Sequence, residues 1–171
     1  MDSLQEIGAF DPVSKEELIR RINGLKTMMA EEGIDFAVIM QNVDMFYFTG
    51  TTQKGMLVIA LDQEPLLFIE KSLTRARLDT PLDIIPIGRD KDARKTLEEK
   101  NILMGKGGME LDVVPVAVFE RFKKMIGFEN FVDISWLIKE LRAIKSPFEL
   151  TQMKKSGAIV SHVFALAGEV I

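Results

Sequence analysis

Apolar residues recur at two different spacings in the first 70 residues of the chain. Between Ser14 and Gly33 they return every three or four positions, which predicts an amphipathic helix that begins after Ser14 and ends at Gly33. Glu17 stands three residues after Ser14, as in a capping box. Uninterrupted apolar runs, which are typical of strands covered on both faces, then occupy residues 36–40, 56–61 and 66–69.

The order of these segments predicts the class of fold. Only a polar turn separates the second and third apolar runs, so we expect an antiparallel hairpin there. Beyond residue 70, helices are expected at 72–78, 91–100, 116–126 and 135–142, and strands at 84–87, 109–111 and 131–134. Such alternation places helices on both faces of a sheet. We therefore predict an α/β fold with a mixed β-sheet flanked by helices on both faces.

The C-terminal segment predicts one more helix, which begins with strong signals and has no closing one. Ser146 is a capping residue, Pro147 stands at the first helical position and Glu149 at the third. An apolar stripe then continues to Ile171. We expect residues 1–145 to form the α/β domain and residues 146–171 to be the first helix of a further, truncated domain.

The charge and the residue composition exclude several classes of function. The net charge is −4 and the isoelectric point is about 5.2, without the clustered Lys and Arg that nucleic acid or an anionic membrane surface requires. The absence of Cys excludes disulfides and thiolate chemistry. The start of the chain has no secretory signal, and the apolar runs are too short to span a bilayer. We expect a cytoplasmic protein that binds neither nucleic acid nor membrane.

Few residues are candidates for catalysis. His162 is the only histidine and lies on the terminal helix, so we interpret it as a surface residue. Residues 105–108, Gly-Lys-Gly-Gly, lack the Ser or Thr and the following helix of a phosphate-binding loop, and are expected to lead into a strand. Glu110 and Asp112 are predicted to share one face of that strand. A hard cation is conceivable there, but with no third ligand nearby we interpret both carboxylates as structural or surface groups.

The segment between the first two strands, residues 44–54, combines the only tyrosine with two phenylalanines and a polar tip. We expect a loop, and loops of this composition at strand ends often form small-molecule sites. The alternative is that Phe46, Tyr47 and Phe48 only hold the loop against the core. From their spacing alone, we favour this second interpretation.

Three stretches resemble one known family. Residues 44–50, Asp-Met-Phe-Tyr-Phe-Thr-Gly, resemble the Asn/Asp-x-x-Tyr-x-Thr/Ser-Gly motif in the amino-terminal domain of creatinase, prolidase and aminopeptidase P enzymes. Residues 141–149, Leu-Arg-Ala-Ile-Lys-Ser-Pro-Phe-Glu, resemble the Leu-Arg-x-Ile-Lys-Ser-x-x-Glu segment that joins this domain to the catalytic pita-bread domain. Residues 108–112 are similar to the Gly-x-Glu strand between them. The chain departs from the family at residues 70–75, where it lacks the tyrosine of an Asp-x-Arg-Tyr pattern.

The resemblance implies a ribonuclease H-like N-terminal domain without catalytic residues or metal ligands of its own. In this family two divalent metals, Mn, Co or Zn, are held by Asp, His and Glu residues of the later domain and activate a water that attacks the carbonyl before proline. The intact protein is thus expected to be a metal-dependent Xaa-Pro dipeptidase or aminopeptidase acting on proline-containing dipeptides or peptides. This chain alone is expected to be inactive and to hold no cofactor.

The resemblance also implies a homodimer, in which the N-terminal domain packs against its own catalytic domain and reaches the active site of the partner subunit. By position, the candidates for the substrate loop are Tyr47, Thr51, Thr52, Gln53 and Lys54, and Lys54 offers a charge for a substrate carboxylate. The alternative is an exposed hairpin tip without a substrate role. A creatinase-type amidinohydrolase and a non-catalytic, peptidase-like interaction module share the same architecture.

Overall fold

The computed structural model describes residues 12–88 and 90–170, which divide by their contacts into two units. The first unit comprises residues 12–141. The described part of the second comprises residues 142–170.

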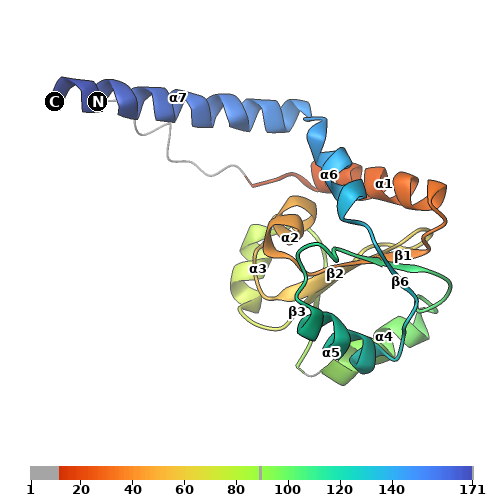
Figure 1. The fold of residues 1–171 in the computed structure, drawn as a ribbon. Helices are drawn as coiled ribbons and strands as arrows, with labels where there is room; N and C mark the ends of the chain where they lie inside the picture. Colours follow the sequence, from red (N-terminus) through yellow and green to blue (C-terminus); the bar gives the residue numbers. More distant parts are fainter. Residues whose placement is uncertain (1–11, 89, 171) are drawn as a thin grey trace. The chain divides into compact units, whose positions relative to one another are not determined.

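The first unit is built on a six-stranded sheet with the strand order β4-β3-β2-β1-β5-β6 (Figure 1). The strands are β1 (Phe36–Ile39), β2 (Gly55–Ala60), β3 (Leu66–Ile69), β4 (Ile84–Pro86), β5 (Gly107–Met109) and β6 (Phe131–Asp133). Strand β2 is antiparallel to both of its neighbours, whereas the other neighbouring strands pair in parallel. The predicted mixed sheet and the predicted hairpin are both confirmed.

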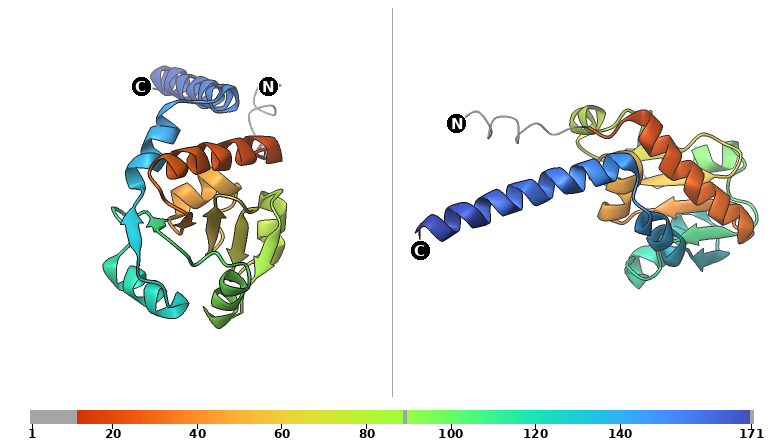
Figure 2. Two further views of the ribbon diagram at one scale, coloured as in Figure 1. Left: turned by 90° about the vertical axis from the view of Figure 1, so that its right-hand side faces the viewer. Right: turned by 90° about the horizontal axis from the view of Figure 1, so that it is seen from above.

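Helices cover both faces of this sheet, as the alternating sequence pattern predicts. The helices of the unit are α1 (Lys15–Glu31), α2 (Asn42–Thr49), α3 (Leu73–Asp79), α4 (Asp90–Glu99), α5 (Val116–Ile126) and α6 (Ser135–Ala143), whose last two residues fall in the second unit. Figures 1 and 2 show α1, α2 and α6 on one face and α4 and α5 on the other. Capping follows the sequence: the Glu17 N–H donates to Ser14 Oγ at 3.2 Å, and Gly127 ends α5 in the left-handed conformation.

Strand β1 lies inside the sheet and supplies side chains to both helical layers. All four of its residues are buried, which explains the uninterrupted apolar run. Phe36 and Val38 belong to the hydrophobic cluster that also contains Leu97 of α4 and Phe122 of α5. Because alternate strand residues point to opposite faces, Ala37 and Ile39 face the layer of α1 and α2.

Strand β5 begins two residues earlier than the sequence indicates, so the predicted range 109–111 is wrong. Glycine is usually unfavourable inside a strand, but side chains from neighbouring elements fill the space where a Cβ would lie. A Cβ on Gly107 would lie 2.7 Å from Cζ of Phe36, and a Cβ on Gly108 would overlap the side chain of Ile134. The glycines therefore form the strand itself, and Glu110 follows its end.

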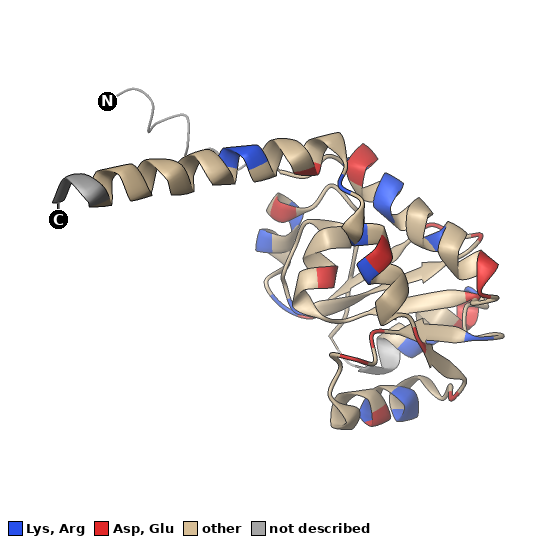
Figure 3. Ribbon diagram, turned by 45° about the horizontal axis from the view of Figure 1, so that its top comes forward, with Lys and Arg blue, Asp and Glu red and all other residues tan. Residues whose placement is uncertain are grey.

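The second unit contains α7 (Pro147–Val170), which begins where the sequence predicts. Its capping box is complete: the Glu149 N–H donates to Ser146 Oγ at 3.1 Å, and the Ser146 N–H donates to Glu149 Oε2 at 2.8 Å. His162 is exposed, as predicted. No charged residue lies between 156 and 167, and Figure 3 shows the contrast with the mixed charges of the first unit. Within the described residues, no helix combines the length and the apolar character needed to cross a membrane.

Substituting Gly108 tests the packing of β5. Gly108→Ala should lower the free energy of unfolding by about 1–3 kcal/mol, because the added methyl overlaps the Ile134 side chain in a filled core. Gly88→Ala is the matched control, since nothing lies within 4 Å of its Cβ position. Urea unfolding of the three proteins would measure the difference. Equal midpoints for the two variants would contradict the packing described for β5.

Candidate functional site

The segment predicted as a loop between the first two strands is mostly helical. Helix α2 occupies Asn42–Thr49, so the loop prediction is wrong for residues 44–49. The Gln41 side chain starts the helix by accepting from the N–H groups of Val43 and Asp44 at 2.6 and 2.9 Å. Gly50 ends it with φ +78°, a left-handed conformation that favours glycine. The loop proper is confined to residues 50–54.

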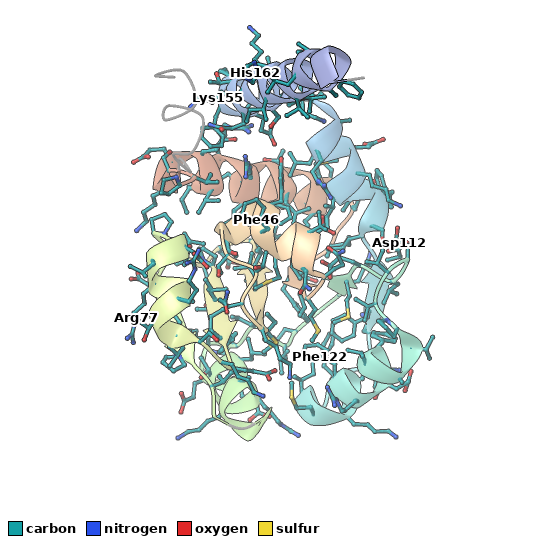
Figure 4. The ribbon with its side chains drawn as sticks, turned by 90° about the vertical axis from the view of Figure 1, so that its left-hand side faces the viewer. Phe46, Arg77, Asp112, Phe122, Lys155 and His162 are labelled. Atoms are coloured by element: carbon teal, nitrogen blue, oxygen red, sulfur yellow. The ribbon has the colours of Figure 1, made fainter. Side chains whose placement is uncertain are left out.

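Tyr47 lies in α2 and faces α1. Only 8% of this residue is exposed. The buried Arg21 guanidinium of α1 lies 4.4 Å from the centre of the Tyr47 ring, and Arg21 Nη1 donates to the Tyr47 carbonyl oxygen at 2.6 Å. The neighbouring Phe48 is fully buried, whereas Phe46 is 38% exposed (Figure 4). Tyr47 and Phe48 therefore anchor α2 in the core.

The base of the loop is fixed by threonine hydroxyls. Thr49 Oγ1 donates to the Met45 carbonyl oxygen at 2.6 Å and accepts from the Thr51 N–H at 3.2 Å. Thr51 is fully buried; its Oγ1 donates to Asp79 Oδ2 of α3 at 3.1 Å and accepts from the Gln53 N–H at 3.3 Å. The loop thus has a defined conformation, because its buried polar groups are paired at both α2 and α3.

Three of the predicted residues lie together at the outer part of the loop. Thr52 and Lys54 are exposed and Gln53 is half-buried. Lys54 Nζ lies 2.6 Å from Glu70 Oε2, with 63% and 35% of the two side chains exposed. The structure therefore joins Thr51, Thr52, Gln53 and Lys54 in one loop but places Tyr47 against α1. The sequence pattern does not identify Asp79 and Glu70 as partners of this loop, because Asp79 ends α3 and Glu70 follows β3, both outside the loop segment.

Glu110 is a buried carboxylate with a raised pKa. It is 1% exposed, and its Oε2 and Oε1 accept from the N–H groups of Met40 and Gln41 at 3.0 and 3.4 Å. Burial raises the pKa of Glu110 to about 7, with a smaller increase from Asp44, while the two backbone N–H groups act in the opposite direction. The carboxylate therefore connects the end of β5 to the start of α2.

Glu110 and Asp112 do not share a strand face, so that prediction is wrong. Both residues follow the end of β5. Asp112 is exposed (Figure 4) and forms an ion pair with Lys139. The hydrogen bond from Lys139 holds the pKa of Asp112 below its usual value.

The described residues do not fit a metal centre. They contain no group of three or more His, Asp or Glu side chains placed to hold a metal ion. Glu110 already accepts two backbone N–H groups.

The comparison with known proteins agrees with this architecture. A family model described as the creatinase/prolidase N-terminal domain matches residues 21–144. The chain is 26% identical to an Xaa-Pro dipeptidase of Pyrococcus furiosus over 88% of its own length and 42% of the relative. It is 26% identical to an ectoine hydrolase of Halomonas elongata, over 94% of the chain and 46% of the relative.

A solved structure shares the fold. The prolidase of Pyrococcus horikoshii superposes on 89% of this chain and 43% of its own with a TM-score of 0.75 and 21% identity. The curated relatives are longer than the chain, which spans 41–46% of their length.

The raised pKa of Glu110 predicts a pH-dependent stability. The folded protein keeps this proton up to about pH 7 whereas the unfolded chain releases it near 4.5, so folding binds a proton between these values and stability falls as pH rises. Glu110→Gln cannot ionise. Its stability relative to the unchanged protein should therefore increase by about 3 kcal/mol between pH 4.5 and pH 7, as measured by urea unfolding at each pH.

Asp112→Asn is the matched control for this pH series. The pKa of Asp112 is lowered from 3.8, so its linkage to stability lies below the tested range, and the difference from the unchanged protein should stay constant between pH 4.5 and pH 7. A Glu110→Gln difference that is equally constant would contradict the buried, protonated state of this carboxyl.

Proposed function

Because the chain belongs to the creatinase/prolidase N-terminal domain family, we propose that it is the non-catalytic N-terminal part of a metal-dependent Xaa-Pro peptidase. The family match carries this proposal. One further observation supports it: the relatives include an Xaa-Pro dipeptidase of which the chain spans 42%. The metal-assisted hydrolysis would then be carried by residues outside this chain.

In this proposal the loop at residues 51–54 helps to shape the substrate pocket of a partner subunit in a homodimer. The structure of the loop supports this role, because a partly buried Thr51–Asp79 hydrogen bond fixes its base while Thr52 and Lys54 remain exposed. A loop with a fixed base can place a charge without a large ordering cost. The Lys54 ammonium would bind the carboxylate of a dipeptide. Its exposed pair with Glu70 is weak enough to be exchanged for such a ligand.

A second hydrolase function is favoured by one observation. A relative named an ectoine hydrolase matches this chain with the same identity as the dipeptidase, 26%, and with similar coverage. The catalytic part could then act on a bond other than Xaa-Pro, as a creatinase-type amidinohydrolase does. The N-terminal loop would still present Lys54 to a carboxylate, so only substrate assays separate the two functions.

If catalysis belongs to residues outside this chain, the chain alone should not hydrolyse Xaa-Pro dipeptides. The purified chain should release no proline from Ala-Pro above a metal-only blank after incubation with Mn²⁺. A longer product of the same gene that includes a catalytic domain should cleave Ala-Pro under identical conditions. Proline release by the chain alone would contradict the proposal. Cleavage of ectoine or creatine, but not Ala-Pro, by the longer product would favour the second function.

The proposed role of Lys54 predicts a selective loss of substrate affinity. In the longer enzyme, Lys54→Ala should raise KM for Ala-Pro by about tenfold with little change in kcat, because it removes a charge-assisted contact made in both the ground and transition states. The same variant should leave KM for Ala-Pro amide unchanged, since that substrate has no carboxylate.

The exposed Lys71 provides the matched control. Lys71→Ala removes the same charge close to Glu70 and should leave KM unchanged for both substrates. Equal kinetics for the Lys54 and Lys71 variants would remove Lys54 from the substrate pocket.

A further inference from the structure

A small cavity lies between the sheet and α5, on the face covered by α4 and α5. Its volume is about 40 Å³, and its lining is mostly apolar, with three methionines, Met40, Met56 and Met125, beside Phe122. Phe122 lies on the side of α5 that faces the sheet (Figure 4). Methionine side chains adapt readily to the shape of a ligand. The cavity is thus an apolar space whose walls can adjust.

The cavity lies where parallel strands end. Three of its lining residues come directly after a strand: Met40 follows β1, Glu70 follows β3 and Ile87 follows β4. These three strands run in the same direction, since β1 and β3 are each antiparallel to β2 and β4 is parallel to β3. In α/β sheets the carboxyl ends of the strands are where ligands bind. The position therefore favours a ligand site over a packing defect.

Two opposite charges border this apolar space. Arg121 of α5 is exposed and forms no ion pair or hydrogen bond with the part of the chain that the structure describes. Glu70 binds Lys54 through Oε2, and its Oε1 has no partner among the described residues. A guanidinium with free donors binds a carboxylate well. A carboxylate oxygen without a partner can accept from an ammonium group.

We propose that this cavity binds a free aliphatic α-amino acid of the size of valine or leucine. Its carboxylate would bind Arg121, its ammonium group would bind Glu70, and its branched side chain would enter the space between the methionines and Phe122. The volume supports this size: about 10–15 Å³ accommodates one water-sized group, so about 40 Å³ suits a side chain of three or four carbon atoms.

The site does not depend on the proposed peptidase function. All of its lining residues belong to the first unit, and the experiment uses this chain without a catalytic domain. Failure of amino acid binding would therefore leave the proposed function intact, and failure of the peptidase assay would leave this site intact.

Methyl NMR of the purified chain tests the proposal directly. With ¹³C-methyl methionine, titration of L-leucine should shift the resonances of Met40, Met56 and Met125 in a saturable manner with a Kd on the order of 1 mM. The Met153 resonance of α7 should not move. Leucinamide, which lacks the carboxylate, and 4-methylpentanoate, which lacks the ammonium group, should each bind at least about tenfold more weakly.

Two arginine variants identify the carboxylate contact. Arg121→Gln should weaken leucine binding by about tenfold or more, whereas Arg77→Gln, a change at an exposed arginine of α3, should leave it unchanged. Both sites are exposed, so neither variant should affect folding. The proposal is overturned if leucine produces no saturable shift of the three methionines, if both analogues bind as tightly as leucine, or if the two arginine variants bind leucine equally.

Discussion

The buried carboxylate of Glu110 is the contact on which the geometry around the candidate site depends. It follows β5 and accepts from the N–H groups of Met40 and Gln41, where the chain leaves β1 and enters α2. Burial disfavours the charged form strongly enough to raise the pKa of this group to about 7. The cost of burying this carboxyl group is offset because it accepts hydrogen bonds from two backbone N–H groups that would otherwise lack this acceptor. Through Met40 and α2, this contact positions both the cavity and the start of the loop.

The loop and the cavity meet at Glu70. Its carboxylate binds Lys54 of the loop and also borders the cavity, and the Glu70 N–H donates to the Lys54 carbonyl oxygen at 2.8 Å. The two proposed sites are therefore neighbours that share one acidic side chain. Exposed ion pairs contribute little to stability, so this group is free to exchange partners without loss of the fold. The partly buried Thr51–Asp79 hydrogen bond holds the loop independently of that exchange.

The chain belongs to the creatinase/prolidase N-terminal domain family and spans 41–46% of the length of its curated relatives. The proposed function therefore assigns catalysis to residues outside this chain. The described residues provide a six-stranded sheet, a loop with exposed polar groups and a long C-terminal helix, but no group of side chains placed to hold a metal ion. Fold similarity at 21% identity establishes architecture and not substrate. The proposed function therefore rests on the family match together with the chemistry of the loop, and each of these can be tested separately.

The sequence by itself determined most of the secondary structure, because periodicity and caps are encoded in neighbouring residues. Helix α5, the β2–β3 hairpin and the Ser146 capping box are where local patterns predict them. The sequence also predicted that residues 51–54 lie in a loop. It missed α2, since an eight-residue helix started by glutamine shows no full apolar stripe.

Only the tertiary structure decided the register of β5, the burial of Glu110 and the cavity beneath α5. Each depends on groups far apart in the chain: Glu110 binds an N–H group 70 residues away, and the side chain of Ile134 occupies the space beside Gly108. Glycine and glutamate carry no local signal for such contacts. Their roles are set by which side chains the folded sheet brings next to them.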